Sequence, residues 1–75
     1  MNLSTAIGHT IRTLRTEQQL KMRQMHPYVS ISHISGIERG VKNASPDLLE
    51  LLAEGVHITT PDLLRKIANT MEEYK

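Results

Sequence analysis

The side chains best suited to chemistry lie in one short stretch, SISHISGIER, at residues 30–39. It holds serines at positions 30, 32 and 35 and a histidine at position 33. Serine and histidine together can form a nucleophilic site, but such a site also needs an oxyanion hole or a nucleophile elbow, and neither signature is present. The same short polar groups can instead hydrogen-bond to a partner molecule. We therefore predict that the protein is not an enzyme.

Patterns for metals, cofactors and membranes are also missing. The sequence has no cysteine, and its four histidines include no pair at the i, i+3 or i+4 spacing that places two ligands on one helical face. No glycine-rich phosphate loop occurs, so we expect no metal and no cofactor. No apolar stretch approaches the roughly 20 residues that cross a bilayer, and no signal peptide pattern is seen. We expect a cytoplasmic protein with no membrane partner.

Charge is distributed unevenly along the chain. Residues 1–42 contain six Lys or Arg and two Asp or Glu, whereas residues 43–75 contain three and six, so the halves carry +4 and −3. This asymmetry favours a polyanion as the partner of the N-terminal half. Chance placement of charges on a solvated surface is the alternative explanation.

A short helix over residues 30–39 must position the serines and the histidine. Ser30 is its predicted N-cap, because a serine side chain can accept from the free amides of the first turn. Ile34 and Ile37 are spaced to face a core. Gly40 supplies the left-handed residue that commonly ends a helix.

Two helices precede this one. The first is predicted to start near Ser4 or Thr5, either of which could cap it, and its apolar spacing leaves Arg12 and Arg15 near solvent. A second, short segment covers residues 20–26 and is ended by the proline that follows, because proline disfavours helical geometry in the residue before it.

Two helices follow, and both open with the same pattern, SPDLL from position 45 and TPDLL from position 60. A Ser or Thr cap, a proline in the first turn and an aspartate near the positive helix end are ordinary start signals, so the likeness does not require a duplication. Connections are a few residues long and no strand is convincing. The sequence predicts one all-α, five-helix domain over residues 1–75.

A short helix, a tight turn and a second helix with small polar residues on its exposed face is the geometry that enters a DNA major groove. Here the helix-turn-helix spans about residues 21–40. Its second helix would present Ile31, Ser32 and His33 to base edges, with Gly36 one turn later, and Ile31 could pack on a thymine methyl. An ordinary surface helix would have the same composition, so the pattern alone leaves both interpretations open.

The stretch ISGIERGVKNASPDLLELLAEGVHITTPDLL, with IGHTIRTLRTEQQL upstream, resembles the Cro/CI-type (XRE-like) helix-turn-helix family of bacterial and phage transcriptional regulators. The resemblance covers about residues 6–68. It implies a compact lambda-repressor-like domain that binds double-stranded DNA as a dimer, with base contacts from the recognition helix and phosphate contacts from the loop after it. The candidate DNA contacts are Ser30, Ile31, Ser32, His33, Ser35, Gly36, Arg39, Lys42 and Asn43. Restriction-modification controller proteins, small phage repressors and helix-turn-helix antitoxins fit equally well.

Two features depart from the family pattern. Members usually begin the helix-turn-helix with a glutamine that braces the phosphate backbone, whereas this chain has Met22 after Lys21. The stretch from residue 25 to residue 29 is also about two residues shorter than the corresponding stretch in most family members. We therefore expect a truncated or tilted first helix and modest base reading. The alternative function is a protein-interaction module of the same fold, antitoxin- or antirepressor-like, that has lost most direct DNA reading.

A stripe on the last predicted helix, at about residues 61–74, suggests a homodimer. The stripe consists of Leu64, Ile67, Met71 and Tyr74. Its spacing of three, four and three puts these side chains on one helical face. Two copies would place their recognition helices about 34 Å apart, on a near-palindromic operator. The alternative is that the end of this helix folds back on the first helix near Leu3 and Ile7.

Overall fold

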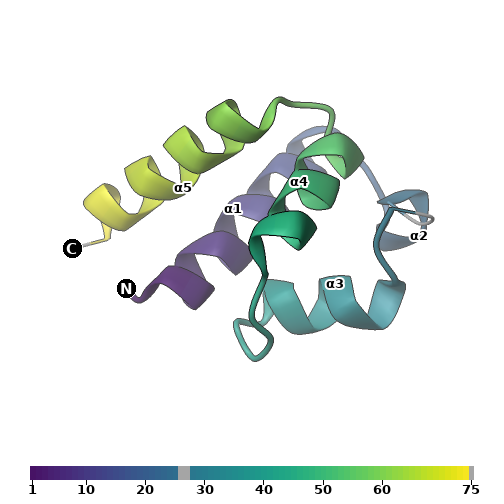
Figure 1. Ribbon diagram of the computed structural model, residues 1–75, viewed down its shortest axis with the longest axis horizontal. Helices are drawn as coiled ribbons and strands as arrows, with labels where there is room; N and C mark the ends of the chain where they lie inside the picture. Colours follow the sequence, from purple (N-terminus) through teal and green to yellow (C-terminus); the bar gives the residue numbers. More distant parts are fainter. Residues whose placement is uncertain (26–27, 75) are drawn as a thin grey trace.

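The computed structural model describes residues 1–25 and 28–74. These residues form five helices and no strand: α1 (Leu3–Glu17), α2 (Met22–Met25), α3 (Ile31–Glu38), α4 (Pro46–Gly55) and α5 (Thr60–Glu73). The predicted all-α, five-helix fold is confirmed. Helix α1 packs against α5 on one side and α3 on the other, while α4 contacts α5 and α2 (Figure 1). None of the helices in the described residues has the length and apolarity to span a bilayer.

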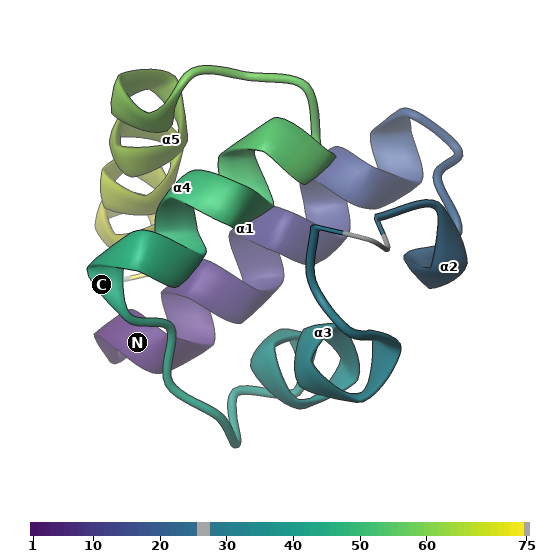
Figure 2. The same cartoon turned by 45° about the vertical axis from the view of Figure 1, so that its right-hand side comes forward.

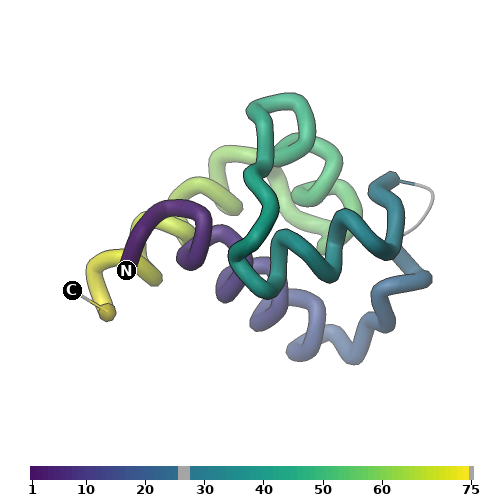
Figure 3. Tube along the Cα trace, turned by 90° about the horizontal axis from the view of Figure 1, so that it is seen from below, coloured from purple at the N-terminus to yellow at the C-terminus, as the bar shows by residue number. Residues whose placement is uncertain are grey.

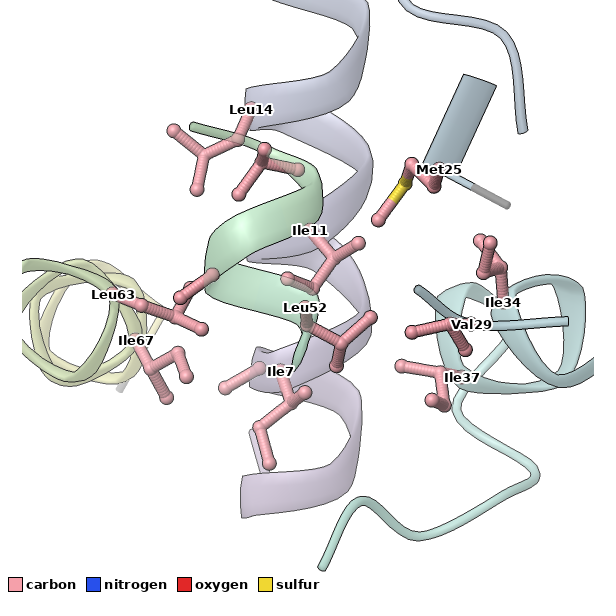
Figure 4. Packing of buried hydrophobic residues seen from close by; sticks show 13 residues of the cluster. Ile7, Ile11, Leu14, Met25, Val29, Ile34, Ile37, Leu52, Leu63 and Ile67 are labelled. Carbon is pink, nitrogen blue, oxygen red and sulfur yellow. The ribbon is translucent and has the colours of Figure 1, made fainter. Parts of the chain in front are cut away.

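The hydrophobic core lies along α1, between the other helices (Figure 4). Its largest buried side chains come from every helix: Ile7, Ile11 and Leu14 from α1, Met25 from α2, Ile34 and Ile37 from α3, Leu52 from α4, and Leu63 and Ile67 from α5. Full burial of one such side chain contributes about 1.5–3 kcal/mol. The core therefore fixes α3 by its inward face, where the sequence predicted the two isoleucines to be buried.

Side-chain caps set where four of the helices start. Ser30, Ser45 and Thr59 each accept a hydrogen bond from the backbone N–H three residues on, which satisfies a free amide of the first turn. The predicted cap of α1 was wrong: Asn2 caps this helix and accepts from the Thr5 amide at 2.8 Å, and Ser4 lies inside it. The cap of α5 is likewise one residue earlier than the TPDLL pattern predicted: Thr59 is the cap, and the helix begins at Thr60.

The first helix of the helix-turn-helix is short. Helix α2 has four residues, Met22–Met25, and the Gln24 side chain accepts from the Lys21 amide at 2.7 Å at its start. The sequence predicted a segment over residues 20–26, and its predicted end at His26 and Pro27 lies outside the described residues. The truncation expected from the sequence depends on that end and therefore stays a prediction.

Among the residues that the structure describes, two that are not glycine adopt left-handed backbone conformations, Gln19 with φ 56° and His57 with φ 61°. This conformation costs a side chain about 1–2 kcal/mol, and glycine avoids that cost but loses about 0.5–1 kcal/mol through its flexible unfolded state. We expect His57→Gly to raise the free energy of unfolding by up to about 1 kcal/mol. Urea denaturation measures this, with Ala68→Gly in the middle of α5 as a control that should lose about 1 kcal/mol. A loss of stability in His57→Gly would contradict the expectation.

Candidate nucleic-acid interface

Helix α3 lies on an outer side of the molecule. Figure 3 shows α3 in front, with the loop that continues from it towards α4, and Figure 2 shows the same loop below α4. Ile31 and Ser32, in the first turn of α3, are exposed, and His33 is partly exposed. Ser30 is exposed as well, and its hydroxyl accepts from the His33 amide at 3.3 Å. The first turn is therefore open to a partner, as the sequence predicted.

The opposite side of α3 is held to α1 by an ion pair. Arg15 donates to both carboxylate oxygens of Glu38, from Nε to Oε2 at 2.7 Å and from Nη2 to Oε1 at 3.0 Å. The third arm of the guanidinium, Nη1, donates to the Leu20 carbonyl at 2.8 Å. Only 14% of the Arg15 side chain and 5% of the Glu38 side chain are exposed. The pair joins α1, α3 and the loop after α1 in one network.

This geometry corrects the prediction that Arg15 lies near solvent. Arg12 is exposed, whereas the side chain of Arg15 points towards α3, because it pairs there with the buried carboxylate of Glu38. The hydrogen bond with Glu38 raises the pKa of Arg15 above its ordinary value, while burial opposes this rise and coulombic attraction to Glu38 adds to it. Arg15 therefore stays protonated and keeps the Glu38 carboxylate paired.

Helices α1 and α3 also approach each other closely at Gly8. Gly8 is buried, and a Cβ at this position would collide with the backbone carbonyl oxygen of Ile37 and lie 3.0 Å from that of Glu38. The lack of a side chain at Gly8 lets the last turn of α3 lie directly on α1. The end of α3 is thus positioned by backbone contact as well as by the ion pair.

The loop after α3 is fixed at both ends. Gly40 has φ 73° and reverses the chain, so that the amides of Val41 and Lys42 both donate to the Gly36 carbonyl, at 3.0 and 3.2 Å. On the far side, the Ser4 hydroxyl donates to Asn43 Oδ1 at 3.0 Å. The loop that carries the predicted phosphate contacts is therefore tied to both α3 and α1.

The predicted DNA contacts differ in how the structure presents them. Arg39 is exposed, and its Nε donates to the Ser35 carbonyl at 3.3 Å, along its own helix. Lys42 and Asn43 are exposed and Ser35 is partly exposed. Gly36 is on the side of α3 that faces away from the core, as expected, but it is buried, because the Lys42 side chain covers it.

The predicted dimer stripe does not form one free surface. Ile67 is 4% exposed and belongs to the core of its own chain, so it is removed from the candidate interface. Met71 is partly buried against the core, whereas Leu64 is 49% exposed and Tyr74 is 50% exposed. Periodicity could not separate a core face from a partner face, since both need apolar residues at the same spacing.

The end of α5 lies near the start of α1. The Tyr74 ring meets the His9 ring edge-on, with centroids 5.3 Å apart, and the N-terminal ammonium donates to the Tyr74 carbonyl at 3.4 Å. Figure 3 shows the two termini side by side. The contacts agree with the alternative in which the end of the last helix folds back on the first.

One exposed aromatic residue was missed in the sequence. Tyr28 is 43% exposed and lies two residues before the cap of α3. It adds an exposed amphipathic side chain to the turn before α3. Its exposure could have been predicted from the sequence, because a tyrosine in a short turn between two helices has few buried side chains to pack against.

Comparisons with known proteins place this geometry among gene regulators. No protein-family model and no curated protein matched the sequence. The crystal structure of the clp gene regulator ClgR from Corynebacterium glutamicum matches with a TM-score of 0.88 at 26% identity, over 99% of this chain and 81% of that chain. The wild-type restriction-modification controller protein C.Esp1396I matches with a TM-score of 0.84 at 20% identity, over 95% of this chain and 94% of that chain.

A point mutant of the same controller matches over 100% of both chains, with a TM-score of 0.90 at 19% identity. At these identities the controller shows the fold alone. The similar structures are regulators rather than enzymes, which agrees with the sequence prediction. The chain thus has the five-helix fold of XRE-like helix-turn-helix regulators, as its sequence resemblance implied.

Proposed function

We propose that the protein is a sequence-specific, DNA-binding transcriptional regulator that inserts α3 into the major groove. The observation that carries the proposal is the open first turn of α3 on a helix whose other side is fixed to α1 by Glu38 and at Gly8. Ser32 and His33 supply hydrogen-bonding groups for base edges, and Ile31 supplies an apolar contact for a thymine methyl. The +4 charge of residues 1–42 favours a polyanion.

Arg39 supplies a phosphate contact in this proposal, since its side chain is exposed at the end of α3. We expect Arg39→Ala to weaken binding about equally for all duplexes and to lower the salt slope by about 1. Fluorescence anisotropy at several salt concentrations measures both quantities. The control is Arg65→Ala, which removes an exposed arginine from α5, where it pairs with Asp62, and should change neither. Equal losses in the two variants would contradict the assignment of Arg39.

His33 has the complementary role of base reading. We expect His33→Ala to change the order of preference among duplexes, because a lost base contact costs about 1–3 kcal/mol on the preferred sequence only. Competition binding with DNA from upstream of the protein's own gene and with mutated versions of it measures the preference. Weak binding that is the same for every duplex in wild type and variant would count against sequence-specific regulation.

The short α2 keeps a second function open, a protein-interaction module of the same fold with little direct DNA reading. Met22 stands where a bracing glutamine is usual, and Tyr28 and Ile31 are both exposed, one before α3 and one in its first turn. Salt dependence separates the two functions, because phosphate neutralisation makes DNA affinity fall steeply with salt. An apolar protein contact changes little over the same range.

A homodimer completes the proposed function, with α5 as the contact. Leu64 supplies an exposed apolar side chain, and a 75-residue domain gains from burying it in a second copy. The two recognition helices would then be about 34 Å apart and would read the halves of a near-palindrome. Tyr74 is the other exposed member of the predicted stripe, and its ring already packs on His9.

We expect Leu64→Glu to shift the protein from dimer to monomer without lowering the stability of the protomer, because half of this side chain lies outside the core. Sedimentation equilibrium over a range of concentrations measures the shift. The matched control is Val41→Glu, which places the same charge at an exposed apolar residue outside α5 and should leave the dimer intact. An unchanged dimer in Leu64→Glu would remove Leu64 from the interface.

A further inference from the structure

Gly36 lies on the outward face of α3. It is about 160° around the helix from Ile34 and about 100° from Ile37, the two buried residues that point to the core. It shares its face with Ser32, one turn earlier, and Arg39, nearly one turn later, and both of these are exposed. A glycine in the middle of this face leaves no side chain where a DNA-binding helix meets base edges.

The Lys42 side chain fills this position. The three heavy atoms nearest to a Cβ built on Gly36 all belong to Lys42: Cδ at 2.6 Å, Cγ at 2.7 Å and Cε at 3.1 Å. The aliphatic stem therefore runs across the outward face of α3 and does not extend away from the loop. Since the ammonium is one bond beyond Cε, it also lies close to this face.

The backbone explains why Lys42 lies there. The amides of Val41 and Lys42 both donate to the carbonyl of Gly36, the residue that the stem covers. The next residue, Asn43, is held by Ser4. The Cα of Lys42 is thus fixed relative to α3, and the lack of a side chain at Gly36 leaves room for the aliphatic stem of Lys42 on the helix.

We propose that Lys42 reads a guanine in the major groove, as the long basic side chain that α3 itself lacks, and that Gly36 positions it. The inference rests on the proposed function and changes the part that Lys42 plays in it, from a phosphate contact to a base contact. Guanine presents two acceptors, O6 and N7, to the major groove, and a lysine ammonium is a suitable donor for both. A stem already packed on the helix loses less rotamer entropy on binding than a free one.

Selection from a library of random duplex DNA with the purified wild-type protein tests the proposal. We expect a guanine at one position of each half-site. Lys42→Met keeps the stem over Gly36 and removes the charge, so it should lose the preference for that guanine about tenfold and keep the rest of the selected sequence. Arg39→Met is the contrasting variant, which should weaken binding while selecting the same sequence as wild type.

Gly36→Ala tests whether Gly36 positions the Lys42 side chain, because the added methyl displaces this side chain while its charge stays in the protein. We expect it to lose the same guanine preference as Lys42→Met, and to add little when combined with it. Thermal denaturation should show a midpoint no lower than that of wild type, since alanine favours a helix interior more than glycine does.

Three results would overturn the proposal, and each is distinct. If Lys42→Met selects the wild-type sequence with uniformly lower affinity, Lys42 is a phosphate contact. If Gly36→Ala keeps the guanine preference, Gly36 does not position Lys42. If the wild-type protein selects no sequence at all, the proposed function fails together with this inference.

Discussion

Arg15→Met should lower the free energy of unfolding by about 3–5 kcal/mol, because it leaves the carboxylate of Glu38 buried and unpaired. Only 5% of that side chain is exposed, so bulk water solvates the carboxylate poorly once the guanidinium is gone. A domain of 75 residues has about 4–11 kcal/mol of stability in total. The variant should therefore be close to unfolding at 25 °C, and urea denaturation at pH 7 measures the loss.

Removing the other partner should cost less. In Glu38→Leu, Arg15 keeps its hydrogen bond to the Leu20 carbonyl, and its longer, 14% exposed side chain can reach water. The double variant should recover part of the loss of Arg15→Met, since no buried charge remains. The matched control is Arg65→Met, which breaks the exposed pair with Asp62 and should cost less than about 0.5 kcal/mol. Equal losses in Arg15→Met and Arg65→Met would contradict the role given to burial.

The sign of the pH dependence follows from the raised pKa of Arg15. A cation whose folded pKa is raised contributes its full stabilisation below its unfolded pKa and loses it as the pH rises through the folded value, and for an arginine both values lie far above neutral pH. The arginine side of this pair therefore gives no change in stability between about pH 5 and pH 9.

The helices could be predicted because their signals are local. Ser30 precedes a pair of isoleucines at core spacing, and Gly40 follows them in a left-handed conformation, so start, buried face and end are all specified within residues 30–40. The error at α1 has the same origin, since Asn2, Ser4 and Thr5 can all cap a helix and only the folded chain selects one. Asn2 is selected, and the Ser4 hydroxyl is then free to donate to Asn43.

The contacts that orient the candidate site could not be predicted, because they join residues far apart in the sequence. Arg15 and Glu38 are 23 positions apart, and nothing local to either indicates the other. The cover of Lys42 over Gly36 depends on a turn of the backbone at Gly40, which periodicity does not describe. Ile67 shows a different limit, since one apolar stripe serves both the core and a possible partner.

The second large effect is expected at Gly8, where α1 and α3 meet. A methyl in Gly8→Ala would collide with the carbonyl oxygen of Ile37, and a backbone atom cannot rotate away as a side chain can. Overpacking of this kind costs about 3 kcal/mol, while alanine gains about 1 kcal/mol in helix propensity, so the net loss should be about 2 kcal/mol. Urea denaturation measures the difference.

Gly55→Ala is the control, because Gly55 is also buried and helical, at the last residue of α4, but its new methyl would meet a side chain and not a backbone atom. At Gly55 the nearest atom is the terminal Cε of Met25, 3.1 Å away, and this flexible end can move by a few tenths of an ångström. We expect no loss, or a small gain, at Gly55. A gain at Gly8 as well would mean that α3 can move off α1 at no cost. Such a gain would count against the proposed function, because a helix that is free to tilt cannot hold its first turn against one set of base edges.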